Sequence, residues 1–134
     1  MLINIPGKEF KRARLLVVDD ESGIRDIFVH LIGGLGHEVV TAARGSEALK
    51  RAQDGLFDVV FCDMMMPGMN GFEVLNGLRR SHENLPVVIM TGCSTAGCES
   101  EARMLGAFAF LKKPFDLGEI SGLIDLALAR KKNG

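Results

Sequence analysis

Five short apolar runs alternate with amphipathic stretches along this 134-residue chain. The runs are rich in β-branched or aromatic residues, as expected for strands that are buried on both faces. They span Leu15–Val18, Glu38–Thr41, Phe57–Cys62, Val87–Met90 and Phe108–Leu111. Because parallel strands need crossover connections, five strands that are each followed by a helix predict an α/β protein with helices on both faces of a parallel sheet.

Apolar residues at helical spacing mark the stretches between the runs. The first helix is predicted from one buried face that contains Ile24, Ile27, Phe28, Leu31, Ile32 and Leu35. Further helices are predicted over Ser46–Gln53 and near Cys98–Leu105. A third helix is marked by Val74, Leu75 and Leu78, and the last helix by Ile120, Leu123, Ile124 and Ala127. Asp116 and Glu119 have the spacing of a capping box at the start of the last helix. Residues 1–13 lack this periodicity, so we predict a leader over 1–13 and one domain over 14–132.

Composition excludes several classes of protein. Lys+Arg 16 against Asp+Glu 17 gives a net charge of -1, which offers no electrostatic reason to bind nucleic acid or an anionic membrane. No apolar run approaches the ~20 residues of a membrane-spanning helix. Three cysteines, an odd number, do not indicate a disulfide framework, so a reducing cytoplasmic location is expected.

The residues that end the apolar runs carry the chemistry. Asp19 and Asp20 follow the first run, Asp63 the third and Thr91 the fourth, while the fifth leads into Lys112 and Lys113. Sites in open parallel sheets form at the carboxyl ends of the strands. Three carboxylates, a hydroxyl and an ammonium are therefore expected to converge on one edge.

The charges of this group constrain what binds there. Crowded carboxylates repel one another and raise one another's pKa unless a cation lies among them. One lysine offsets one of the three negative charges on Asp19, Asp20 and Asp63. Carboxylates with water are the ligands that Mg²⁺ prefers, so we expect Mg²⁺ at this edge. With Mg²⁺ bound, Asp63 could attack a phosphoryl group as a carboxylate nucleophile.

Taken singly, these residues have ordinary explanations. An Asp pair after a strand is often a turn or a helix cap, and a lone lysine is most often a solvated surface charge. The functional interpretation rests on their joint placement at successive strand ends.

The motifs around these residues resemble those of a known family, the receiver domains of two-component response regulators, with the CheY-like fold. The resemblance covers Arg14 to Arg130. It is carried by LVVDDE (16–21), DMMMPGMNG (63–71), VIMTG (88–92) and GAFAFLKKPF (106–115). The resemblance implies a flavodoxin-like, doubly wound (βα)5 three-layer sandwich with a five-stranded parallel sheet in the order 2-1-3-4-5.

The resemblance also implies a role for each site residue. Asp63 is expected to be the phospho-acceptor, with Mg²⁺ held by Asp19, Asp20, Asp63 and the backbone carbonyl of Met65. Thr91 and Lys113 would bind the phosphoryl oxygens, Thr91 and Phe110 would form the switch, and Lys113–Pro114 would be a cis peptide bond.

The partners implied by the resemblance are a sensor histidine kinase or phosphotransfer protein, and a downstream target or output domain. The domain is expected to be a switch and not a dedicated enzyme. As a switch it would act through the surface of its fourth helix, fifth strand and fifth helix. Dimerisation through the fourth and fifth helices is left open.

Three alternative classes of protein fit the sequence less well. A pseudo-receiver that only binds partners is disfavoured by the intact set of site residues. A flavodoxin-like redox protein would need a phosphate loop after the first strand, where this chain has Asp19-Asp20-Glu21, and aromatic residues beside a flavin, where it has no Trp or Tyr. An Asp-nucleophile phosphatase would carry a second Asp at position 65, which is Met65 here.

The remaining histidine, cysteine and methionine residues are given structural roles. His30, His37 and His82 are expected at the surface and Cys62 in the core. Met64, Met66 and Met69 are expected to pack around the acceptor loop, and Cys93 and Cys98 lack the further ligands of a metal site.

Overall fold

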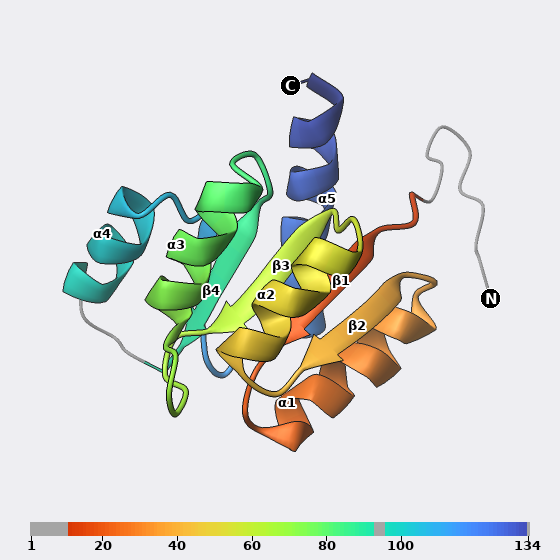
Figure 1. Ribbon diagram of the computed structural model, residues 1–134. Helices are drawn as coiled ribbons and strands as arrows, with labels where there is room; N and C mark the ends of the chain where they lie inside the picture. The colour runs from red at the N-terminus through yellow and green to blue at the C-terminus, as the bar shows by residue number, and fades with distance from the viewer. Residues whose placement is uncertain (1–10, 93–95, 134) are drawn as a thin grey trace.

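All five predicted strands form one parallel sheet. The computed structural model describes residues 11–92 and 96–133 (Figure 1). The strands are β1 (Arg14–Val18), β2 (Glu38–Ala42), β3 (Val59–Asp63), β4 (Val87–Thr91) and β5 (Ala109–Lys112). Their order in the sheet is β2-β1-β3-β4-β5, which confirms the predicted flavodoxin-like topology.

Helical segments connect the strands, as the crossover argument requires. They are α1 (Ser22–Ile27), which continues into the π-helical turn η1 (Phe28–Ile32), then α2 (Gly45–Asp54), α3 (Gly71–Ser81), α4 (Ala96–Met104) and α5 (Leu117–Asn133). The capping box predicted for the last helix is present: the Glu119 amide donates to Asp116 Oδ1 at 2.8 Å, and the Asp116 amide donates to Glu119 Oε1 at 3.2 Å.

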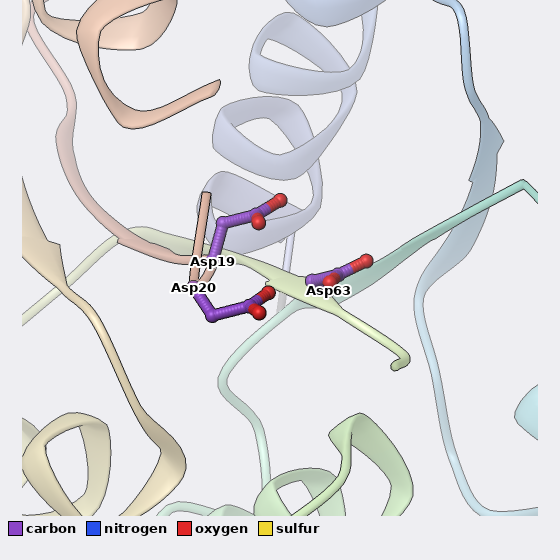
Figure 2. Close-up of side chains that lie close together, drawn as sticks. All are labelled: Asp19, Asp20 and Asp63. Atoms are coloured by element: carbon purple, nitrogen blue, oxygen red, sulfur yellow. The ribbon is translucent and has the colours of Figure 1, made fainter. Parts of the chain in front are cut away.

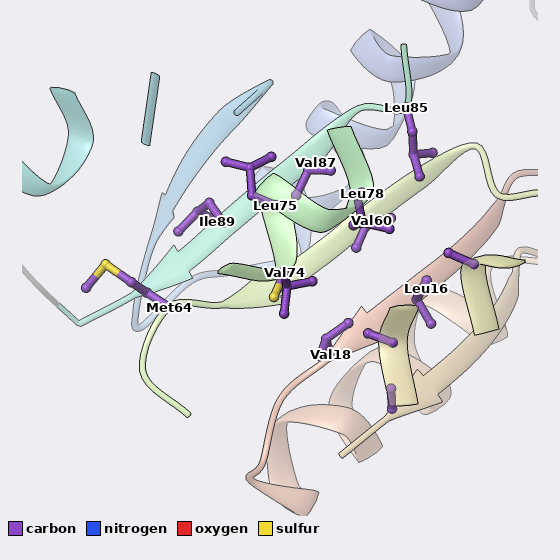
Figure 3. Close-up of a cluster of buried hydrophobic side chains, with 14 of the residues drawn as sticks. Leu16, Val18, Val60, Met64, Val74, Leu75, Leu78, Leu85, Val87 and Ile89 are labelled. Atoms are coloured by element: carbon purple, nitrogen blue, oxygen red, sulfur yellow. The ribbon is translucent and has the colours of Figure 1, made fainter. Parts of the chain in front are cut away.

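The sheet separates two hydrophobic layers. Strand residues that point to one face pack against α2, α3 and α4, in a cluster that includes Leu16, Val60, Ile89, Val74 and Leu75 (Figure 3). Alternate residues of the same strands point to the other face and pack against η1 and α5, in a cluster that includes Val17, Phe61, Phe28, Ile120 and Ile124. β3 and β4 are buried along their whole length, because a hydrophobic layer covers each face of these central strands. Asp63 and Thr91, the last residues of these two strands, belong to the candidate site.

The side of the sheet to which successive strands are added reverses between β1 and β3. From β1 the chain crosses first to β2 on one side, and then returns to β3 on the other side of β1. Ligands of open α/β sheets bind at such a switch point, outside the carboxyl ends of the strands. The topology therefore places a crevice where β1 runs into Asp19 and where β3 ends at Asp63.

The first helix departs from the prediction. Phe28 and Ile32 are fully buried, but Ile27 and Leu31, expected on the same buried face, are 41% and 45% exposed, and Leu35 is 37% exposed. The π-helical turn over Phe28–Ile32 takes more residues per turn than an α-helix. It therefore rotates the apolar positions away from the single face that a regular period predicts.

Two further expectations are corrected. His37, expected at the surface, is buried, and its Nδ1 accepts a hydrogen bond from the Ala13 amide at 2.9 Å. Cys98, expected without a disulfide, is disulfide-bonded, whereas Cys62 is a free thiol in the core, as predicted. Cys93 lies outside the described residues, as do residues 1–10 of the predicted leader.

The methionines of the acceptor loop are placed as expected. Met64 and Met66 are buried in the cluster that packs against α2, α3 and α4, and Met69 packs against that cluster. Within the described residues, no helix combines the length and the apolar character needed to cross a bilayer.

Candidate functional site

Three carboxylates meet at the carboxyl edge of the sheet, between β1 and β3. Asp19 and Asp20 follow β1, and Asp63 is the last residue of β3. Each offers an oxygen that lies within 4.8 Å of the others (Figure 2). Asp19 and Asp63 are buried and Asp20 is exposed, so the group opens to solvent on the Asp20 side. The convergence predicted from the strand ends is therefore present for these three residues.

The ammonium of Lys113 lies among these carboxylates. Its Nζ is 3.0 Å from Asp19 Oδ2 and 3.1 Å from Asp63 Oδ1. The Lys113 amide donates to the carbonyl of Thr91 at 2.8 Å, which ties the end of β5 to the end of β4. The Lys113–Pro114 peptide bond is cis. Lys112, by contrast, has an exposed side chain.

The electrostatics of the site raise the pKa of Asp63 to about 6. Burial is the main cause, because it disfavours the charged form, and the negative charge of Asp19 adds to it. Lys113 works in the opposite direction, as a hydrogen-bond donor to Asp63. Partial burial of Lys113 opposes its own charged form, but its hydrogen bonds to Asp19 and Asp63 raise its pKa above the usual value.

These residues fit a small divalent ion. All the candidate ligands are carboxylate oxygens, which suit hard cations. Mg²⁺ binds oxygens at ~2.1 Å, so its ligands lie up to ~4.2 Å apart, and a small contraction of the observed group would reach that spacing. The ammonium of Lys113 offsets one of three negative charges, which leaves a surplus that a divalent ion would neutralise.

The start of α3 packs directly against the backbone of Asp63. Asn70 caps α3, since its side chain accepts from the Glu73 amide and the Glu73 side chain accepts from the Asn70 amide. A Cβ atom added to Gly71 would lie 2.5 Å from the backbone oxygen of Asp63. Glycine is required at 71 because the helix and the end of β3 approach so closely.

Three further predicted residues lie at the end of β4, on β5 and just after β3. Thr91, the last residue of β4, is buried. Phe110 is half-buried on β5 and packs against the cluster of α2, α3 and α4. Met65 follows the carboxyl end of β3 and exposes 71% of its surface.

Two charged residues beside the group are given no role in the site by the sequence. Glu21 places Oε1 3.7 Å from Lys113 Nζ. Arg25, in the first turns of α1, donates from Nη1 to the backbone oxygen of Asp19 at 2.6 Å. Their closeness in sequence to Asp19 and Asp20 was the available signal, but it does not specify which atoms they contact.

Comparison with known proteins agrees with this geometry. Residues 15–125 match the family described as "Response regulator receiver domain". The chain is 36% identical over 119 residues to the DNA-binding transcriptional regulator NtrC of Escherichia coli (strain K12), a match that covers 89% of this chain and 25% of NtrC. It is 35% identical over 120 residues to sporulation initiation phosphotransferase F of Bacillus subtilis (strain 168), which covers 90% of this chain and 97% of that protein.

Solved structures show the same fold. The chemotaxis protein CheY4 of Vibrio cholerae superimposes with a TM-score of 0.83 at 34% identity, over 87% of this chain and 99% of that one. A response regulator receiver domain protein from Clostridium thermocellum gives 0.85 at 34% identity, over 90% and 97%. The chain spans about a quarter of the length of the NtrC relatives that it matches. With a family match over most of the chain and the carboxylate group at the switch point of a CheY-like fold, this protein belongs to the response regulator receiver domains.

Proposed function

We propose that this domain is a phosphoryl-accepting switch, in which Asp63 takes a phosphoryl group from a phosphohistidine of a partner kinase or phosphotransfer protein. The observation that carries this proposal is the placement of Lys113 between Asp19 and Asp63, beside three carboxylates at the switch point of the sheet. This arrangement supplies a nucleophile, a cation for the incoming phosphate and a set of oxygen ligands in one place.

Asp63 is the nucleophile in this proposal. With a pKa of about 6 it is mostly ionised at neutral pH, as a carboxylate nucleophile must be. One of its oxygens forms a bond to phosphorus while the phosphorus–nitrogen bond of the phosphohistidine breaks. The electron pair of that bond remains on the imidazole nitrogen, and the product is an acyl phosphate on Asp63.

We propose that Asp19, Asp20, Asp63 and the backbone carbonyl of Met65 hold Mg²⁺. When bound, the ion would neutralise negative charge on the transferring phosphoryl oxygens. The chain's own residues then position those oxygens, with the Lys113 ammonium and the Thr91 hydroxyl as donors. Lys113 already lies 3.1 Å from Asp63 Oδ1, within reach of a group attached there.

The switch is proposed to run through Thr91 and Phe110. Hydrogen bonds to charged groups are worth ~1.5–3 kcal/mol each, so two new bonds from Thr91 and Lys113 would supply roughly 3–6 kcal/mol. About 5.5 kcal/mol converts a 1:99 equilibrium into 99:1. Inward movement of Thr91 would leave space for Phe110, whose ring lacks a hydroxyl and would act by packing alone. The surface that changes is formed by α4, β5 and α5, and Thr91→Ala should uncouple it from phosphorylation.

The wider role is proposed from family membership. We propose that residues 14–132 form the receiver, that it acts as a switch and not as a dedicated enzyme, and that it controls a downstream target or output domain in the cytoplasm. The net charge of -1 supports a domain that itself contacts neither nucleic acid nor membrane. Sedimentation of the chain with and without phosphorylation tests dimerisation through α4 and α5.

The test is phosphorylation by a small donor. The wild-type chain, incubated with acetyl phosphate and Mg²⁺, should gain the mass of one phosphoryl group on the peptide that contains Asp63, and hydroxylamine should remove it. Asp63→Asn should gain nothing, whereas Asp26→Asn, which changes an exposed carboxylate on α1, should behave as wild type. A folded wild-type chain that gains no mass, or gains it equally after Asp63→Asn, would overturn the proposal.

A further inference from the structure

Arg25 contacts the segment that carries two of the three carboxylates. Its Nη1 donates a hydrogen bond to the backbone oxygen of Asp19 at 2.6 Å. Arg25 is half-buried in α1, and its contact lies on the peptide unit that joins Asp19 to Asp20. A side chain six residues along the chain therefore holds the backbone between the two acids.

The two acids differ in how they are held. The Asp19 carboxylate accepts from the Glu21 amide at 2.9 Å and from Lys113 at 3.0 Å, and the Asp19 amide donates to the Ala42 carbonyl at 3.1 Å. Within the described part of the chain, the exposed Asp20 carboxylate makes no hydrogen bond or ion pair. The backbone therefore fixes the Cα–Cβ bond from which the Asp20 carboxylate extends, and Arg25 holds the peptide unit that precedes that bond.

We infer that Arg25 is a positioning residue, which orients the Asp19–Asp20 peptide so that both carboxylates face the divalent ion. This inference rests on the proposed function, since it concerns the affinity of the same site for Mg²⁺. Residues that orient metal ligands from outside typically change metal affinity by 10- to 100-fold when they are replaced.

The charge of Arg25, taken alone, predicts the opposite change in Mg²⁺ affinity when this residue is replaced. A guanidinium beside the site repels a divalent cation, so removal of its charge without loss of position would strengthen Mg²⁺ binding. Loss of position would weaken it. The direction of the change therefore separates a positioning role from a nearby charge.

The experiment is a Mg²⁺ titration of the full chain, followed by calorimetry or by the amide resonances of residues 19–21. We expect Arg25→Met to bind Mg²⁺ ~10- to 100-fold more weakly than wild type. Arg25→Lys, which keeps the charge and a single donor, should fall between the two. Arg80→Met, on the exposed face of α3, is the matched control and should bind as wild type.

The outcomes are distinguishable. Affinity that is unchanged or higher in Arg25→Met, or a loss that Arg80→Met reproduces, overturns the inference. If Arg25→Met does not fold, Arg25→Lys decides: weaker binding at an unchanged free energy of unfolding supports positioning, and equal binding overturns it. A wild-type chain that binds no Mg²⁺ overturns the proposed metal site itself, and this inference with it.

Discussion

At the carboxyl ends of the strands, the carboxylates of Asp19, Asp20 and Asp63 lie together, and the Lys113 ammonium contacts two of them, Asp19 and Asp63. At the amino ends, charged groups are matched with partners. Arg14, the first residue of β1, pairs with Glu38 at 2.6 Å, and its guanidinium also donates to the Leu56 carbonyl at 2.9 Å. Like charges are therefore crowded at the carboxyl ends of the strands, whereas opposite charges are paired at the amino ends.

The amino ends of the strands carry contacts that stabilise the fold, whereas the carboxyl ends carry the groups that we propose bind a cation. The Arg14 amide donates to Asp58 Oδ2 at 2.7 Å, its guanidinium lies 4.5 Å from the centre of the Phe57 ring, and each contact lowers the energy of the folded chain. The raised pKa of Asp63 means that its ionised form is disfavoured by folding. Groups that disfavour the folded state in this way cluster at functional sites, because they are kept for binding.

The largest expected effect is a gain of stability when Asp63 is neutralised. The difference between its ordinary pKa of 3.8 and about 6 is roughly two units, which at 1.36 kcal/mol per unit corresponds to about 3 kcal/mol at pH 7. The folded protein holds this proton to a higher pH than the unfolded chain, so the stabilising contribution is lost as pH rises from about 4 to about 6.

Urea unfolding at pH 7 without divalent ions measures this effect. Asp63→Asn should raise the free energy of unfolding, and the gain should shrink as the pH is lowered. The exposed Asp26→Asn should leave stability within about 0.5 kcal/mol of wild type. A loss of stability in Asp63→Asn would mean that the acidic group is not strained by its own charge.

At the amino ends of the strands, removal of a carboxylate is expected to lower the stability of the fold. Asp58→Ala removes the acceptor of the partly buried Arg14 amide, so we expect a loss of about 1–3 kcal/mol in the free energy of unfolding. Glu38→Gln, in a more exposed ion pair, should cost less than about 1 kcal/mol. Neither variant should alter Mg²⁺ affinity, and a shared effect on affinity would break the division between the two ends.

A smaller effect concerns the pH dependence of the amino end. Burial lowers the pKa of His37, with Asp125 and Asp58 acting against burial and Arg12 acting with it. Since Nδ1 accepts the Ala13 amide, the folded protein favours the neutral ring. The stability that His37 contributes is present above its unfolded pKa of 6.5 and is lost as pH falls through the lower folded value.

Unfolding curves of wild type and His37→Gln across this range test the prediction. The wild type should lose stability relative to the variant as the solution is acidified. Parallel curves would show that His37 does not titrate on unfolding. This loss on acidification is opposite in sign to the effect of Asp63, so the two ends should be separable by pH alone.

Much of the fold could be predicted because its signals are local. Short runs such as Val87–Met90 and the acid at the end of Phe57–Cys62 indicate buried parallel strands with chemistry at their carboxyl ends, and topology brings those ends together. The capping box of Asp116 and Glu119 is equally local, since it depends on spacing along one helix.

What escaped prediction depends on contacts between distant segments or on a change of helical period. His37 is buried because its ring accepts from Ala13, a partner 24 residues away. Ile27 and Leu31 are exposed because η1 interrupts the regular period. The bond from Arg25 to the Asp19 carbonyl involves a backbone atom, which no residue type identifies in advance.

The carboxyl resonance of Asp63, followed by NMR during a pH titration with and without Mg²⁺, tests the central claim most directly. The account predicts a pKa of about 6 without divalent ions, and a marked fall when Mg²⁺ neutralises the group. A pKa near the ordinary 3.8 that does not respond to Mg²⁺ would contradict the claim that these carboxylates are held together for a cation.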